Sequence, residues 1–235
     1  MCVIIYKPKG INFPSEEILE NCWWSNWDGA GVGWKNRKGV KLQKGFMDYE
    51  NLLSFLSTLS ITDEVIIHFR IATSGGVNPT CTHPFPISNR LTDLRALTGS
   101  FSALMAHNGI LGQGDDKAEI SDTMEFIADI VSSPIIRDNL DNRFIKDYLS
   151  LKSGSSKLIF MGNFPTFMLG KWIEVDGLLF SNDSFKPYTS VVAKDLCIFC
   201  GSHLTEWEVG NITTLECPEC EAIYDQYGRW ISDTE

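Results

Sequence analysis

Four of the seven cysteines in this 235-residue chain are spaced like the ligands of a metal ion. They form two Cys-x2-Cys pairs, Cys197 with Cys200 and Cys217 with Cys220, with 16 residues between the pairs. Four thiolates suit tetrahedral Zn²⁺, because each pair fits on a tight turn and the intervening residues can form a hairpin. Sulfur at all four positions leaves none open for water. The spacing therefore predicts a structural zinc ion in a zinc ribbon over residues 195–231, with two redox pairs as the alternative.

The predicted ribbon is strongly acidic. Residues 195–235 contain nine acidic residues and one basic residue, which accounts for −8 of the net charge of −10 on the whole chain. Phosphate binding needs the opposite sign, so this charge argues against a nucleic-acid partner and favours a packed subdomain or a protein-docking surface. The ribbon's aromatic residues are expected to form its own small core rather than an interface: Trp207, Tyr224, Tyr227 and Trp230.

Cys2 becomes the first residue if the initiator methionine is removed, a cleavage that small second residues permit. A thiol and a free α-amine on one residue form a nucleophile with its own base. Their unperturbed pKa values are about 8.5 and about 7.7–8.0, so proton transfer between them near neutrality costs little. The alternative is a small apolar residue on an edge strand.

Cys2 is followed by five short motifs in a fixed order. Together they resemble the class II glutamine amidotransferases, whose glutaminase domain belongs to the N-terminal-nucleophile hydrolases, and they are closest to the stand-alone members. The resemblance predicts a glutaminase domain over residues 2–190. The motifs that carry it are Asn26-Trp27-Asp28-Gly29-Ala30-Gly31, His68-Phe69-Arg70-Ile71-Ala72-Thr73, His83-Pro84-Phe85, His107-Asn108-Gly109 and Ser121-Asp122-Thr123.

The resemblance implies hydrolysis of the side-chain amide of glutamine to glutamate and ammonia. Cys2 would attack the amide carbon, its amine would carry the proton, and water would hydrolyse the resulting glutamyl thioester. The side chain of Asn108 and the backbone N–H of Gly109 would form the oxyanion hole. A plain hairpin turn at Asn108-Gly109 is the structural alternative.

Glutamine also carries a carboxylate and an ammonium group, and the resemblance implies partners for both. Arg70 offers two coplanar donors to the carboxylate, and Thr73 and His83 belong to the same set of substrate-binding residues. Asp122 would pair with the ammonium group. The structural alternatives are an ion pair for Arg70, a helix-dipole contact for Asp122, and loop bracing for His83 and His107.

Three features depart from the family pattern. Ser25-Asn26 stands where many members have Arg-Gly, and Ser74 follows Thr73 where histidine is frequent. The third is that only the ribbon segment follows the glutaminase domain, with no synthase domain. Three functions stay open: a glutaminase that supplies ammonia to a separate synthetase, a hydrolase of another γ-glutamyl amide, and an inactive module that recruits a protein through its ribbon.

Hydrophobic periodicity and turn residues predict the elements that position these residues. Ser15 and Ser121 are expected to cap helices, and Asp176-Gly177 is expected to form a hairpin turn. The glycines of residues 29–34 predict a strand whose backbone is closely approached by another segment. Strands at both ends of the stretch with helices between them indicate an α+β fold, and the resemblance implies a four-layer αββα sandwich of two antiparallel sheets. His68 is expected to be a core histidine. Strands are predicted at Cys2–Tyr6, Gly29–Trp34, Val65–Arg70, Ala103–His107, Leu158–Met161, Thr166–Val175 and Leu178–Phe180, and helices at Ser15–Trp24, Tyr49–Leu59, Ser121–Val131 and Leu140–Leu149.

Composition narrows the class of protein. With 43% hydrophobic and 11% aromatic residues, the chain has enough apolar side chain for a folded core, which excludes disorder and rod-like repeats. No run of about 18 apolar residues predicts a membrane span, and the start lacks the features of a signal peptide. The odd number of cysteines argues against a secreted disulfide framework, with Cys22 and Cys81 expected as buried thiols. We therefore expect a soluble cytoplasmic protein.

Overall fold

The computed structural model describes residues 2–71, 76–112, 120–187, 196–197, 200–209, 212–225 and 230–233. The chain divides into two compact units, residues 1–187 and residues 188–235. Thr73 and Ser74, which the sequence singled out, lie outside the described residues. Within the described ranges, no helix is long and apolar enough to cross a membrane.

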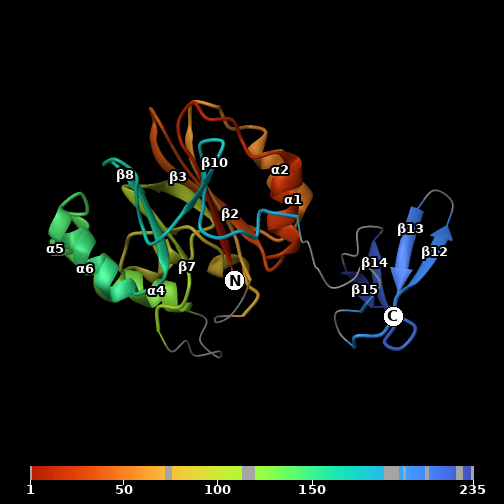
Figure 1. The fold of residues 1–235 in the computed structure, drawn as a ribbon. Helices are drawn as coiled ribbons and strands as arrows, with labels where there is room; N and C mark the ends of the chain where they lie inside the picture. The colour runs from red at the N-terminus through yellow and green to blue at the C-terminus, as the bar shows by residue number, and fades with distance from the viewer. Residues whose placement is uncertain are drawn as a thin grey trace. The chain divides into compact units, whose positions relative to one another are not determined.

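The first unit is built around a seven-stranded antiparallel sheet with strand order β10-β11-β1-β4-β2-β3-β6 (Figure 1). Strand β1 lies between β11 and β4, so the start of the chain is held in the middle of the sheet. The strands are β1 (Val3–Lys7), β2 (Ala30–Asn36), β3 (Gly39–Phe46), β4 (Glu64–Phe69), β6 (Thr98–Phe101), β10 (Ile173–Val175) and β11 (Leu178–Phe180).

A second antiparallel sheet of four strands has the order β5-β7-β8-β9. One hydrophobic cluster takes Ile4 and Leu42 from the large sheet and Leu104 and Ile159 from the small one, so the two sheets pack face to face. Burial of these side chains drives the packing. The strands are β5 (Phe85–Pro86), β7 (Ala103–Asn108), β8 (Lys157–Gly162) and β9 (Phe167–Leu169).

Helices pack on the other face of each sheet. Leu19 of α1 and Leu52 of α2 share a hydrophobic cluster with the large sheet, whereas Met124 of α4 and Leu149 of α6 share one with the small sheet. This arrangement confirms the predicted α+β fold with antiparallel sheets. The helices are α1 (Glu16–Trp24), α2 (Tyr49–Leu56), η1 (Pro79–Cys81), α3 (Leu91–Leu94), α4 (Asp122–Phe126), the π-helix η2 (Ile127–Val131), α5 (Pro134–Arg137) and α6 (Arg143–Ser153).

Strand β2 is glycine-rich because another segment lies directly on it. A Cβ atom on Gly31 would collide with the carbonyl oxygen of His83, and one on Gly33 would come within 2.9 Å of Pro84 Cγ. The glycine pattern predicted such an approach, and the structure confirms it. The glycines therefore bring the His83-Pro84 segment against the central sheet.

The structure corrects several predicted elements. Thr166–Val175 was expected to be one strand, but it forms β9 and β10 in different sheets, and the chain turns between them at Gly170 with φ +87°. The helix expected over Leu140–Leu149 begins after Asn142, whose side chain accepts the N–H of Phe144. The predicted caps Ser15 and Ser121 are both confirmed.

Strand β3 escaped prediction because a lysine occupies one of its buried positions. Val40, Leu42, Lys44 and Phe46 are all buried. The Lys44 Nζ donates to two backbone carbonyls at 2.9 Å and lies 3.8 Å from the centre of the Phe85 ring. Burial lowers the pKa of Lys44 well below its ordinary value. The buried amino group is held by contacts that the strand pattern itself does not reveal.

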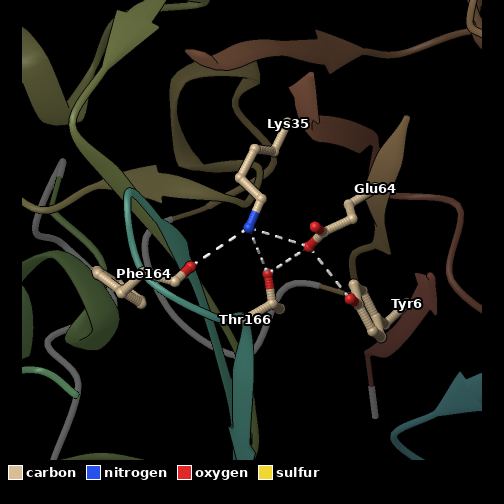
Figure 2. A network of polar contacts seen from close by, with 5 residues as sticks. All are labelled: Tyr6, Lys35, Glu64, Phe164 and Thr166. Carbon is tan, nitrogen blue, oxygen red and sulfur yellow. Dashed lines mark hydrogen bonds and ion pairs between the residues drawn. The ribbon is translucent and has the colours of Figure 1, made fainter. Parts of the chain in front are cut away.

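The ends of β1 and β4 farthest from Cys2 carry a polar network that links the two sheets. Figure 2 shows Glu64 at its centre, accepting hydrogen bonds from Tyr6 at 3.2 Å and from Thr166 at 2.7 Å. Lys35 on β2 lies 3.2 Å from the same carboxylate oxygen and also donates to the carbonyl oxygen of Phe164. Burial and the neighbouring Glu64 raise the pKa of Tyr6 to about 12, so it stays a hydrogen-bond donor.

The second unit is a four-stranded antiparallel sheet with strands in chain order. Its first hairpin lies between the two cysteine pairs, as the spacing predicted. Cys197, Cys217, Ala222 and Tyr224 form its buried cluster. The strands are β12 (Thr205–Val209), β13 (Ile212–Glu216), β14 (Ala222–Asp225) and β15 (Trp230–Asp233).

Candidate functional site

Cys2 lies immediately before β1, beside the end of β4. Its Sγ is 3.4 Å from both the backbone nitrogen and the carbonyl oxygen of Ile71, which follows that strand. The side-chain amide of Asn182 donates to the Cys2 carbonyl oxygen at 2.8 Å. Burial raises the pKa of the Cys2 thiol, against the effects of the Ile71 hydrogen bond and the charge of Arg70. The thiol therefore needs a base before it can act as a nucleophile.

A small pocket with a cavity volume of about 20 Å³ lies at this thiol. It brings together five of the seven catalytic and substrate-binding residues expected from the sequence, although they come from five separate parts of the chain. Asn108 lies between two of the lining residues in sequence, and Thr73 falls outside the described residues. The lining residues are Cys2, Arg70, Ile71, His83, His107, Gly109, Ser121, Asp122 and Thr123.

Arg70 is a buried cation, with 3% of its surface exposed. Its Nη1 donates to the carbonyl oxygen of Gly76 at 2.7 Å. Its backbone bonds to the Asp28-Gly29 segment in both directions, at 2.8 and 3.0 Å. The Asn26–Gly31 motif and the Arg70 motif are therefore adjacent, which places a positive charge at the pocket.

Asn108 and Gly109 end strand β7 beside the pocket. The Asn108 Nδ2 donates to Ser181 Oγ at 2.8 Å, and the same hydroxyl oxygen accepts the N–H of Ile4 at 2.8 Å. Gly109 has φ +146°, and a Cβ there would collide with the Ser156 hydroxyl. Only glycine fits this position, so the turn is more constrained than a plain hairpin.

Asp122 is the first residue of α4, capped by Ser121. Its Oδ2 accepts the N–H of Leu111 at 3.1 Å, and its Oδ1 accepts the N–H of Thr123 at 2.7 Å. The carboxylate is thus fixed at the pocket by backbone donors.

Three of the four histidines in the chain gather here. His68 and His83 stack with ring centres 4.2 Å apart, and His107 lies 6.3 Å from His83. Within the described residues, His83 has no hydrogen-bond partner at either ring nitrogen and His107 has none at Nε2. Buried polar groups almost always have partners, so a water or a ligand is expected to pair with these atoms.

Burial keeps all three histidines neutral. It lowers the pKa of His68 to about 3 and that of His107 to about 4, the latter against the charge of Asp122. It also lowers the pKa of His83 well below its ordinary value, with neighbouring histidines adding to the effect. His68 is the core residue that the sequence predicted, although its Nδ1 lacks a partner within the described part of the chain.

Sequence reasoning missed Ser181 and Asn182, which follow β11. Both are polar and lie directly after an apolar strand, a position that alone does not indicate a site. Their roles depend on β11 lying beside β1, which places Ser181 opposite Ile4.

The second candidate site is the cysteine cluster of the ribbon. The four Sγ atoms all lie within 4.8 Å of one another, and both Cys197–Cys220 and Cys200–Cys217 are 3.4 Å apart. A tetrahedral ion with Zn–S bonds of about 2.3 Å needs sulfur atoms about 3.8 Å apart, so these residues fit a metal ion. Each of the two Cys-x2-Cys pairs in the sequence supplies one half of this cluster.

The two pairs sit in equivalent turns. In each turn, the carbonyl oxygen of the first cysteine accepts a hydrogen bond from the N–H of the residue four positions later. The N–H of the same cysteine donates to the carbonyl oxygen of the residue five positions later, and all these distances are 2.7–2.9 Å. The residue four positions on has a left-handed backbone in both cases, Gly201 at φ +76° and Glu221 at φ +59°. The same backbone geometry therefore presents both cysteine pairs to the cluster.

The ribbon's aromatic residues differ in how far they are buried. Tyr224 is fully buried with its hydroxyl 3.0 Å from Cys197 Sγ, so the prediction of a core residue is confirmed for it. For Trp207 the prediction is wrong, because it is 54% exposed. Tyr227 and the side chain of Trp230 lie outside what the structure describes. Cys22 and Cys81 are the buried thiols expected.

The arrangement of the first site provides a nucleophile, a buried cation, a carboxylate and unpartnered histidine nitrogens around one pocket. A scan against protein-family models and a search of curated proteins find no match to this chain.

Proposed function

We propose that the first unit is a glutaminase of the class II amidotransferase type, which hydrolyses the side-chain amide of glutamine and releases ammonia for an acceptor handled by a separate partner. Two face-to-face sheets with helices outside them fit the αββα sandwich of N-terminal-nucleophile hydrolases. The observation that carries the proposal is the Cys2 thiol in one pocket with Arg70 and Asp122.

In the proposed reaction, Cys2 Sγ attacks the amide carbon and its own α-amine takes the thiol proton. The amine passes that proton to the departing nitrogen, ammonia leaves, and a glutamyl thioester forms. Water then hydrolyses the thioester to glutamate and restores the thiol. The side-chain amide of Asn108 and the N–H of Gly109 would stabilise the oxyanion in both steps.

Arg70 would bind the α-carboxylate of glutamine and Asp122 its ammonium group. A ligand with both charges matches a pocket that holds one buried cation and one carboxylate. The proposed partner for the ribbon's cysteines is one structural Zn²⁺, held by Cys197, Cys200, Cys217 and Cys220. Bound there, the ion would stabilise the ribbon, and no step of the hydrolysis involves it.

Intact mass under denaturing conditions tests the proposal. We expect a chain that lacks Met1 and gains one adduct from a thiol-reactive glutamine mimic, and no adduct on the Cys2→Ala variant. Cys22→Ala serves as the matched control, because this buried thiol lies in the hydrophobic core and should not change labelling. A chain that retains Met1 and stays unmodified would contradict the proposal, because Cys2 would then lack its amine base.

A further inference from the structure

A short chain of hydrogen bonds runs from Asp122 to His107 through the hydroxyl of Thr123. The Thr123 Oγ1 lies 3.2 Å from Asp122 Oδ1 and 3.0 Å from His107 Nδ1. Thr123 is fully buried and His107 is 3% exposed, so water does not compete for these bonds. The direction of each bond decides which ring nitrogen of His107 carries the proton.

The hydroxyl has a single proton and two neighbours. An ionised carboxylate is a stronger acceptor than a neutral imidazole nitrogen, so the Thr123 hydroxyl donates to Asp122. Its oxygen must then accept from His107 Nδ1. Because burial keeps His107 neutral, the ring has one N–H only, and Nε2 is left with a lone pair.

This lone pair belongs to a residue that lines the Cys2 pocket, and it has no partner within the described residues. Asp122 lines the same pocket and adds a negative charge nearby, which favours a cationic donor over a neutral one. We propose that Thr123 holds His107 in the Nδ1–H tautomer, so that His107 Nε2 accepts a hydrogen bond from the ammonium group of the substrate. The tautomer rests on the hydrogen bonds of Thr123 and on the burial of His107, whereas the identity of the ligand rests on the proposed function.

If the two hydrogen bonds of Thr123 ran in the opposite direction, the pocket would have a different preference. If Thr123 donated to His107 Nδ1, the ring proton would sit on Nε2, and the pocket would present a donor for an anion there. Thr123 would then set a preference for a carboxylate. The two arrangements thus differ in which ring nitrogen of His107 carries the proton, and this difference can be measured.

Nitrogen-15 NMR of the full chain labelled at histidine tests the tautomer without any substrate. We expect a protonated Nδ1 and an unprotonated Nε2 for His107, assigned through its own backbone resonances. Thr123→Val, which keeps the volume and removes the hydroxyl, should lose this bias, and Thr123→Ser should retain it. Thr166→Val is the control, because its hydroxyl belongs to the network at the far ends of β1 and β4. A protonated Nε2 in the unmodified chain would overturn the inference.

Binding of two stable diacids tests the ligand. Glutamate has the ammonium group and glutarate lacks it, so we expect calorimetry to show glutamate bound at least tenfold more tightly. In Thr123→Val the affinity for glutamate should fall about tenfold, the typical effect of one hydrogen bond to a charged group, while that for glutarate should stay within about twofold. An equal loss for both ligands would make Thr123 merely structural and overturn the positioning role. If neither ligand binds the unmodified chain, the ammonium assignment fails together with the proposed function, whichever tautomer NMR shows.

Discussion

The Cys2 pocket and the cysteine cluster of the ribbon are assembled in opposite ways. Each half of the cluster is made by one short turn, in which hydrogen bonds reach only four or five residues along the chain. The pocket instead combines residues from the starts of β1 and α4 with residues from the ends of β4 and β7. Ser181, far along the chain, bonds to Ile4 and to Asn108. Local geometry thus suffices for each cysteine turn, whereas the pocket depends on how the sheets pack.

The two sites also satisfy their polar groups differently. The cysteine turns are closed by their own backbone, and a metal ion would complete them. In the pocket, the described structure leaves buried nitrogens of His83 and His107 without partners. Unpaired buried groups cost stability, so a ligand that pairs these nitrogens should stabilise the first unit.

Removing the metal should have the largest effect and should be confined to the ribbon. A chelator, or Cys217→Ser, is expected to unfold β12–β15 while the first unit stays folded, because structural zinc contributes about 10–16 kcal/mol to such domains. Residue-resolved NMR with a metal assay measures this. The control is Cys22→Ser, a buried cysteine outside the cluster. An intact ribbon sheet without metal would contradict the expectation.

Acid should destabilise the first unit next most strongly. His68 and His107 have pKa values lowered to about 3 and about 4 in the fold, against about 6.5 in the unfolded chain, so the unfolded state binds more protons between those values. Their contribution is fully present above pH 6.5 and is lost as the pH falls toward 4, at about 1.4 kcal/mol per pH unit for each histidine. Hydrogen exchange of β4 and β7 amides at pH 6.5, 5.5 and 4.5 measures how steeply the free energy of unfolding falls as the pH is lowered.

His68→Phe keeps a ring in the stack and removes one of these titrations. The free energy of unfolding of this variant should therefore change with pH less steeply, by about 1.4 kcal/mol per pH unit. An identical slope in this variant would show that His68 does not contribute to acid unfolding.

Ser181→Ala should weaken the pocket by a smaller amount. The variant removes the acceptor of the Ile4 N–H and of the Asn108 amide, which leaves buried donors unpaired at a cost of about 1–3 kcal/mol. Ser153→Ala is the matched control, because that buried hydroxyl bonds only to a carbonyl within its own helix at 3.3 Å. Urea unfolding of both variants measures the difference, and equal losses would argue against a special role for Ser181.

The smallest effect is expected from substitutions in the two cysteine turns of the ribbon. Glu221 has a left-handed backbone that suits glycine, so Glu221→Gly should stabilise the metal-bound ribbon by about 1 kcal/mol. Gly201→Ala at the equivalent position should destabilise it by a similar amount. Thermal unfolding of the metal-bound chain checks both. Changes of the same sign would show that the turns are not equivalent.

Sequence reasoning did well where a feature depends on neighbours in the chain. The caps Ser15 and Ser121 and the turn at Asp176-Gly177, which joins β10 to β11, were all visible as local signals. It failed at β3, where Lys44 occupies a buried position, because the carbonyls that bind this lysine come from residues 36 and 50 positions away. It also missed the break at Gly170, since sheet membership is not a local property.

By itself, the sequence determined the spacing of the four clustered cysteines, most helix starts and the apolar strands, because each follows from backbone geometry or periodicity over a few residues. Only the tertiary structure decided that Arg70, His107, Gly109 and Asp122 share a pocket with Cys2. It also decided that Thr123 links Asp122 to His107. Such contacts depend on which strands become neighbours and how two sheets pack, and many distant side chains determine these jointly.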